Sequence, residues 1–97
     1  MIVGFRNLKS FNDGTTKRVC VSALEDATKG EEEIKFVIID QTKTVKVNFS
    51  ANQEQTVCVN HTASSNGRQM VTVSATGSTQ TLSLLLDVNK QPSDDGV

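Results

Sequence analysis

The sequence predicts an all-β protein, a seven-stranded antiparallel β-sandwich in a single domain. Apolar and polar residues alternate with a period of two through most of the chain, as in strands with one buried face. Valine occurs 12 times and threonine 11 times among the 97 residues, and both β-branched types favour strands. Turn-forming residues interrupt the alternation at short, regular intervals, which is typical of antiparallel sandwiches.

The alternation defines seven expected strands. The first is a short apolar segment, and each of the others places apolar side chains on one face. The strands are expected at residues 1–5, 17–24, 32–40, 42–50, 54–62, 68–75 and 78–89. The expected inward-facing residues are Val19, Val21, Ala23, Ile34, Phe36, Ile38, Val45, Val47, Phe49, Val57, Val59, Val71, Val73, Ala75, Leu82, Leu84, Leu86 and Val88.

Turn chemistry separates these strands. The main signals are Asn12-Asp13-Gly14, Lys29-Gly30, Ser64-Ser65-Asn66-Gly67 and Gly77-Ser78. The number and spacing of the strands predict an immunoglobulin- or fibronectin type III-like sandwich over residues 1–90. Residues 91–97 are expected to be a flexible tail or linker. A helix over residues 23–35 is the alternative for that segment, although Gly30 interrupts it and apolar spacing of three and four is missing.

Composition excludes several functional classes. The net charge of −1 provides no electrostatic footprint for nucleic acid, and no apolar run approaches the roughly 20 residues needed to span a bilayer. Without Trp or Tyr, only four Phe remain for stacking on a base or a sugar.

The chain also lacks the residue patterns of common active sites. There is no glycine-rich phosphate loop and no Cys-x-x-Cys pair. His61, the only histidine, is expected on the surface at a strand end. We therefore expect neither an enzyme nor a cofactor, a metal site or a small-molecule substrate.

The two cysteines have matching surroundings. Cys20 and Cys58 each lie between two valines, so both should point away from the core on neighbouring strands. Opposed side chains on neighbouring strands are close enough for a disulfide. The pattern favours a Cys20–Cys58 disulfide and hence a secreted, extracellular protein. Two unrelated thiols in a cytosolic protein are the alternative.

Two segments match the N-glycosylation pattern. They are Asn48-Phe49-Ser50 and Asn60-His61-Thr62. Asn48 and Asn60 both have the parity of the expected solvent face, which suits a glycoprotein. No signal peptide is recognised at the start of the chain, so a secreted form would be a mature or excised segment.

Strict alternation fails at residues 36–39 and 84–86, where both faces are apolar. Val37, Ile39 and Leu85 are therefore expected to form an outer patch that docks on a neighbouring domain or another protein. The alternative is that loops or the first strand cover these residues.

Residues 67–80, Gly-Arg-Gln-Met-Val-Thr-Val-Ser-Ala-Thr-Gly-Ser-Thr-Gln, resemble a hairpin of the first macroglobulin-like domain. This domain opens the alpha-2-macroglobulin and complement family of thioester-containing proteins. The spacing of Cys20 and Cys58 is similar to that of a disulfide in the same domain, and residues 7–9 and 15–21 also run in parallel. The chain departs from the family at Arg6-Asn7, where a proline is frequent, and it contains neither the Gly-Cys-Gly-Glu-Gln thioester motif nor a bait region.

The resemblance implies a non-catalytic structural domain of a secreted innate-immunity protein. Such a domain would dock on neighbouring macroglobulin-like domains within a protease-inhibitor or complement-like assembly. Only the two cysteines are implied to share a role with the family. The alternative is a stand-alone extracellular binding or adhesion module, which would recognise a protein through loops such as residues 12–16 and 64–67.

Overall fold

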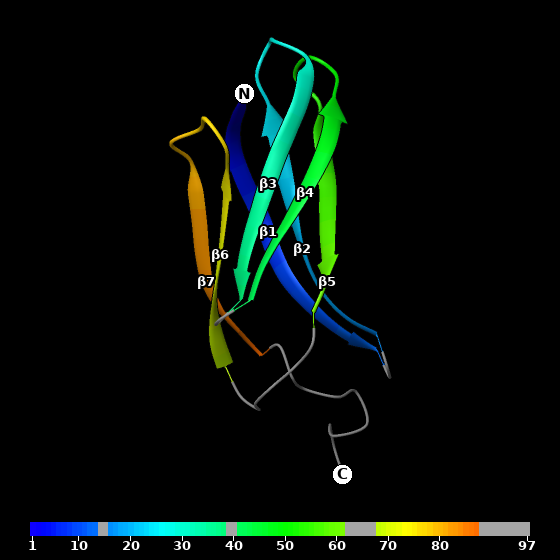
Figure 1. Ribbon diagram of the computed structural model, residues 1–97, viewed down its shortest axis with the longest axis vertical. Coiled ribbons are helices and arrows are strands. Elements are labelled where there is room, and N and C mark those ends of the chain that lie inside the picture. Colours follow the sequence, from blue (N-terminus) through cyan, green and yellow to red (C-terminus); the bar gives the residue numbers. More distant parts are fainter. Residues whose placement is uncertain (14–15, 39–40, 62–67, 88–97) are drawn as a thin grey trace.

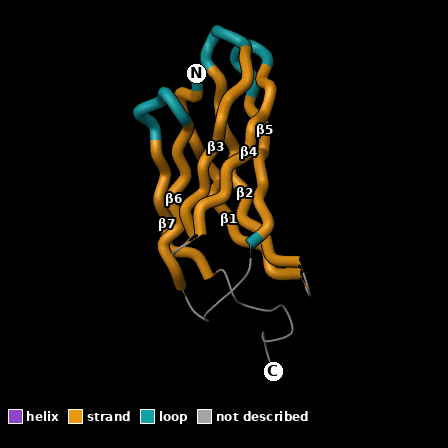
Figure 2. The backbone as a smooth tube through the Cα atoms, in the orientation of Figure 1, coloured by secondary structure: helices purple, strands orange, loops and turns teal. Residues whose placement is uncertain are grey.

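The computed structural model describes residues 1–13, 16–38, 41–61 and 68–87, which form seven antiparallel strands in two sheets (Figure 1). Strand order is β1-β2-β5 in one sheet and β4-β3-β6-β7 in the other. Strands account for most of the described chain, with short turns between them (Figure 2). The predicted all-β, seven-stranded sandwich is confirmed. The strands are β1 (Ile2–Asp13), β2 (Thr16–Glu25), β3 (Gly30–Ile38), β4 (Gln41–Phe49), β5 (Glu54–Asn60), β6 (Arg68–Ala75) and β7 (Thr81–Asp87).

The core lies between the two sheets and is aliphatic. Phe36 is the largest fully buried side chain, and full burial of such a side chain stabilises the fold by about 1.5–3 kcal/mol. In the three-stranded sheet, Val19 and Val21 lie opposite Val59 and Val57, and all four are buried. The predicted inward parity is confirmed in β2, β3, β5 and β6. In β4, Phe49 is buried, whereas Val45 and Val47 are only partly buried.

The position of β4 distinguishes this sandwich from constant-type immunoglobulin domains. In those domains the fourth strand belongs to the same sheet as the first, second and fifth. Here β4 pairs with β3 along the whole length from Gly30↔Phe49 to Ile38↔Gln41. Strands β2 and β5 still pair directly, as the predicted disulfide requires.

The first strand is much longer than expected. The sequence predicts a strand at residues 1–5, but β1 continues to Asp13 and pairs with β2 over its length. A shift of register between Arg6 and Lys9 interrupts the pairing, and Asn7 within it has a φ of 58°. This β-bulge breaks the period-two alternation in the sequence. The alternation therefore does not predict that the strand continues after Phe5.

The alternative of a helix over residues 23–35 is ruled out, and the expected exposure of His61 is wrong. Residues 23–35 are not helical: β2 ends at Glu25, and Asp26 Oδ1 accepts a hydrogen bond from the Thr28 backbone N–H at 2.8 Å in the turn before β3. His61 is not on the surface, since only 7% of it is exposed. It shares the inward parity of Val57 and Val59, so it continues the buried face beyond the end of β5.

Hydrogen bonds at the turn between β6 and β7 reach β1 of the three-stranded sheet and β3 of their own sheet. Ser78 Oγ donates to the Ile2 carbonyl of β1 at 2.6 Å, and the Thr76 backbone N–H donates to the Glu33 carbonyl of β3 at 3.1 Å. Gly77 adopts a φ of 81°, which an L side chain would disfavour. The predicted Gly77-Ser78 turn therefore also connects the β1 edge to the four-stranded sheet.

Candidate functional site

A disulfide joins the centre of β2 to the centre of β5. Cys20 and Cys58 are direct cross-strand partners with a Cα–Cα distance of 4.1 Å. Their side chains have the opposite parity to the buried valines, so the bridge lies on the outer face of the three-stranded sheet. The pairing predicted from the flanking valines is confirmed. Cys20 is only 5% exposed, whereas Cys58 is open to solvent.

The two predicted glycosylation residues lie on exposed strand positions. Asn48 is near the end of β4, where its backbone carbonyl accepts a hydrogen bond from Gln55 Nε2 at 2.7 Å. Asn60 ends β5 opposite Arg18. Both side chains are accessible, and their glycosylation stays a prediction.

The predicted docking residues belong to the four-stranded sheet and differ in exposure. Leu85 of β7 is 55% exposed, Val37 of β3 is half-buried, and Ile39 lies outside the described residues. Met70 is not among the predicted docking residues, but it lies directly opposite Leu85 and is 51% exposed. The sequence does indicate this position, because Met70 alternates with the inward-facing Val71 and so should point outward.

Leu84 also differs from expectation. It has the predicted inward parity of β7 but is an exposed side chain. The reason is the place of β7 at the edge of its sheet, where the opposite layer covers the inner face only in part. Met70 and Leu85 therefore form an exposed apolar pair on the outer face at this edge, which we call the β6–β7 patch. Leu84 points to the other face of β7 and is not part of it.

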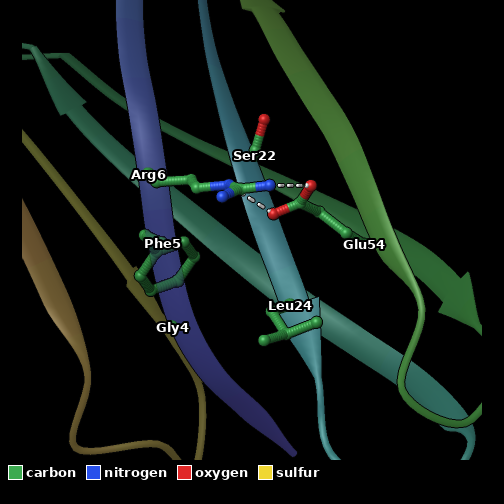
Figure 3. Close-up of a pocket in the computed structure, with 6 residues that line it drawn as sticks. All are labelled: Gly4, Phe5, Arg6, Ser22, Leu24 and Glu54. Carbon is green, nitrogen blue, oxygen red and sulfur yellow. Dashed lines mark hydrogen bonds and ion pairs between the residues drawn. The ribbon is translucent and has the colours of Figure 1, made fainter.

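The outer face of the three-stranded sheet contains a hollow of about 290 Å³ near the start of β1 (Figure 3). Arg6 crosses in front of β2 to Glu54 on β5. Its Nη2 donates to Glu54 Oε1 at 2.8 Å, and its Nε lies 2.7 Å from Oε2. The hydrogen bond to Glu54 raises the pKa of Arg6 above its ordinary value. The lining residues are Gly4, Phe5, Arg6, Ser22, Leu24 and Glu54.

A second hollow, of about 360 Å³, lies over the disulfide on the same face. The Arg18 guanidinium lies over the Phe11 ring, with its central carbon 5.7 Å from the ring centroid. Lys9 is the cross-strand partner of Cys20. The lining residues are Asn7, Lys9, Phe11, Arg18, Cys20, Ser22, Thr56 and Cys58.

Carboxylates gather around the amino group of Met1. This group forms an ion pair with buried Glu25 and lies 3.0 Å from both Asp26 Oδ1 and Glu32 Oε2. The hydrogen bond to Glu25 outweighs the loss of hydration and raises the pKa of the amino group from 8.0 to about 11. Burial would raise the pKa of Glu25, but hydrogen bonds with Glu32 and the amino group lower it.

Within the described ranges, His, Cys, Asp and Glu side chains do not gather in a group of three suited to a metal ion. Nor do the described residues include a helix long and apolar enough to cross a membrane. Of the two loops expected in the alternative function, residues 64–67 and Gly14-Thr15 lie outside the described part.

No protein-family model, no curated protein and no solved structure matches the chain.

Proposed function

We propose that the chain is a non-catalytic, extracellular β-sandwich domain that docks on a neighbouring domain of a larger protein through the β6–β7 patch. The observation that supports this most directly is the pair Met70 and Leu85, which lie side by side across two strands and are each more than half exposed. Their burial against an apolar surface would remove this area from water.

The disulfide supports an extracellular setting, since such bridges persist in oxidising compartments. The resemblance to the first macroglobulin-like domain, in residues 67–80 and in the Cys20–Cys58 spacing, supports the finer proposal. On that proposal the larger protein is a secreted thioester-type protein of innate immunity, either protease-trapping or complement-like.

A hydrogen-exchange comparison tests the docking proposal. The native gene product and the isolated chain are exchanged in parallel, and the backbone amides of β6 and β7 are compared. We expect stronger protection in the native product and a native mass well above 10.5 kDa. Equal protection of β6 and β7 in both, or a native product of the mass of this chain, would contradict the proposal.

Substitutions locate the docking face. Met70→Lys with Leu85→Lys should weaken the contact in the native product and lower the protection of β7. Leu24→Lys is the matched control, because Leu24 is an exposed leucine on the outer face of the other sheet. If Leu24→Lys had the same effect, the docking face would be wrongly assigned.

A second candidate is a stand-alone extracellular module that recognises a protein ligand. The two adjoining hollows on the three-stranded sheet favour it, because concave surfaces with a few polar groups are the usual form of a binding site. The mass of the native product separates the candidates: a product of 10.5 kDa would favour the stand-alone module.

A further inference from the structure

We propose that the outer face of the three-stranded sheet binds an extended peptide with one apolar side chain and, four residues away, an acidic side chain. This site lies on the opposite sheet from the β6–β7 patch, so it does not depend on the docking proposed above. Two hollows, the charges around them and the bulge in β1 support this site.

The two hollows adjoin at Ser22, which lines both, and the Arg6–Glu54 ion pair crosses β2 near this point. At one end Leu24 is 38% exposed, and Gly4 is its cross-strand partner. Phe5 borders this end, but it lies opposite buried Ala23 and packs against the core. Gly4 leaves this end open, since a Cβ added there would meet no heavy atom within 4 Å. This end can therefore accept an apolar side chain.

The other end is cationic. Lys9 and Arg18 line it, and none of the other described residues that line it is acidic. Among the residues whose side chains the structure describes, neither forms an ion pair, whereas Arg6 is neutralised by Glu54. Ser22 Oγ and Thr56 Oγ1, 3.5 Å apart, add hydroxyl groups between the strands. A carboxylate would receive charge-assisted hydrogen bonds here.

The bulge in β1 brings the cations to this face. Before it Arg6 lies opposite Ser22, and after it Lys9 lies opposite Cys20. Two residues, Asn7 and Leu8, therefore oppose one residue of β2. Without the extra residue, the parity would turn Leu8 outward over the disulfide and Lys9 inward. Instead Leu8 is buried, and Lys9 and Phe11 face outward.

The distance between the two ends selects an extended peptide. Leu24 and Cys20 are four residues apart on β2, which corresponds to about 13 Å along a strand. In a peptide of the same conformation, side chains four residues apart point to the same face and span the same distance. A sulfated glycan would match the cationic end, but it offers nothing apolar for Leu24.

A displayed library of random nonapeptides, selected on the intact disulfide-bonded chain, tests the inference. We expect enriched peptides to contain Asp or Glu four residues from Leu, Ile, Phe or Met. A synthetic peptide of the enriched sequence should bind more weakly as salt is added. No enrichment, or enrichment without an acidic residue, would overturn the inference.

Charge reversal identifies the cationic end. Lys9→Glu with Arg18→Glu should weaken binding of the synthetic peptide by about tenfold or more, because one hydrogen bond to a charged group is worth at least that factor. If the double glutamate variant does not fold, Lys9→Gln with Arg18→Gln removes the two charges without reversing them. Lys35→Glu is the matched control, since Lys35 is an exposed lysine of β3 on the other sheet. Equal weakening by Lys35→Glu would refute the site.

Filling the apolar end provides an independent check. Gly4→Val places a side chain in open space and suits a strand. It should remove the preference for an apolar residue while the acidic preference remains. A heparin hexasaccharide serves as the competing probe. If it bound at Lys9 and Arg18 while no peptide was enriched, the face would be a glycan site and the peptide inference would be wrong.

Discussion

The outer faces of the two sheets are stabilised in different ways. On the three-stranded sheet, a disulfide joins β2 to β5 and a bidentate ion pair joins β1 to β5. On the four-stranded sheet, the interactions between β6 and β7 are a hydroxyl pair, Thr72 with Ser83 at 2.9 Å, and the apolar pair of Met70 with Leu85. The first face is cross-linked and concave, and the second consists of strands paired in regular register.

The difference also appears in the backbone. The pairings β3–β4, β3–β6 and β6–β7 run without a shift of register in the described residues, whereas β1–β2 shifts twice. A β-bulge removes ladder hydrogen bonds and increases twist, so it costs stability unless other interactions offset the loss. The irregular pairing β1–β2 thus belongs to the same sheet as the covalent link, which joins the regular pairing β2–β5.

The largest expected effect comes from removing that link. Cys20→Ala with Cys58→Ala should lower the free energy of unfolding by about 4 kcal/mol, since the bridge closes a loop with a sequence separation of 38. Chemical denaturation measures the change. Thiol titration of the denatured, unreduced wild-type chain should find no free sulfhydryl, as both cysteines are paired. A loss of unfolding free energy smaller than that caused by Thr72→Ala with Ser83→Ala would contradict this expectation.

The next effect concerns the bulge. Asn7→Val should lower the free energy of unfolding by about 1–2 kcal/mol, because a β-branched residue resists the φ of 58°. Asn7→Gly should cost little, since glycine adopts this conformation readily. Asn52→Gly is a matched control in the turn before β5, with a φ of 59°. Equal stability of Asn7→Val and Asn7→Gly would show that the bulge conformation is not what constrains this position.

This bulge also marks the limit of what the sequence could predict. Alternating valines in β2 and β5 placed the core and paired the cysteines correctly, because each residue's face follows from parity alone. In β1 one inserted residue reverses that parity. The only sign of the insertion in the sequence is Asn7, a residue type that tolerates a positive φ. The hollows depend on Gly4, Arg6 and Glu54 coming together across three strands, a juxtaposition set by register rather than by local pattern.

A smaller effect is expected on the four-stranded sheet. Thr72→Ala with Ser83→Ala removes an exposed cross-strand hydroxyl pair and should lower the free energy of unfolding by about 0.5–1 kcal/mol. Chemical denaturation beside the cysteine variant compares the two faces directly. A loss as large as that from the cysteine variant would show that the four-stranded face is held as firmly as the other.

The smallest effect is expected where the cross-sheet contact is ionic and open to solvent, at the amino group of Met1. Its pKa rises from 8.0 to about 11 in the folded state, so its stabilising contribution is complete below pH 8 and is lost as the pH rises from 8 to 11. The pKa of Glu25 is lowered instead, so the contribution of this carboxylate is lost as the pH falls below its ordinary value of 4.5. Solvent screens the exposed amino group and limits the size of both changes.

Acetylation of the amino group isolates this contribution. The acetylated chain keeps every side chain, so its lysines titrate as before, but it has no ammonium to lose. We therefore expect the free energy of unfolding of the unmodified chain to fall more steeply between pH 8 and 11 than that of the acetylated chain. Parallel slopes would mean that the ammonium contributes nothing measurable to the contact between the start of the chain, Glu25 of β2 and Glu32 of β3.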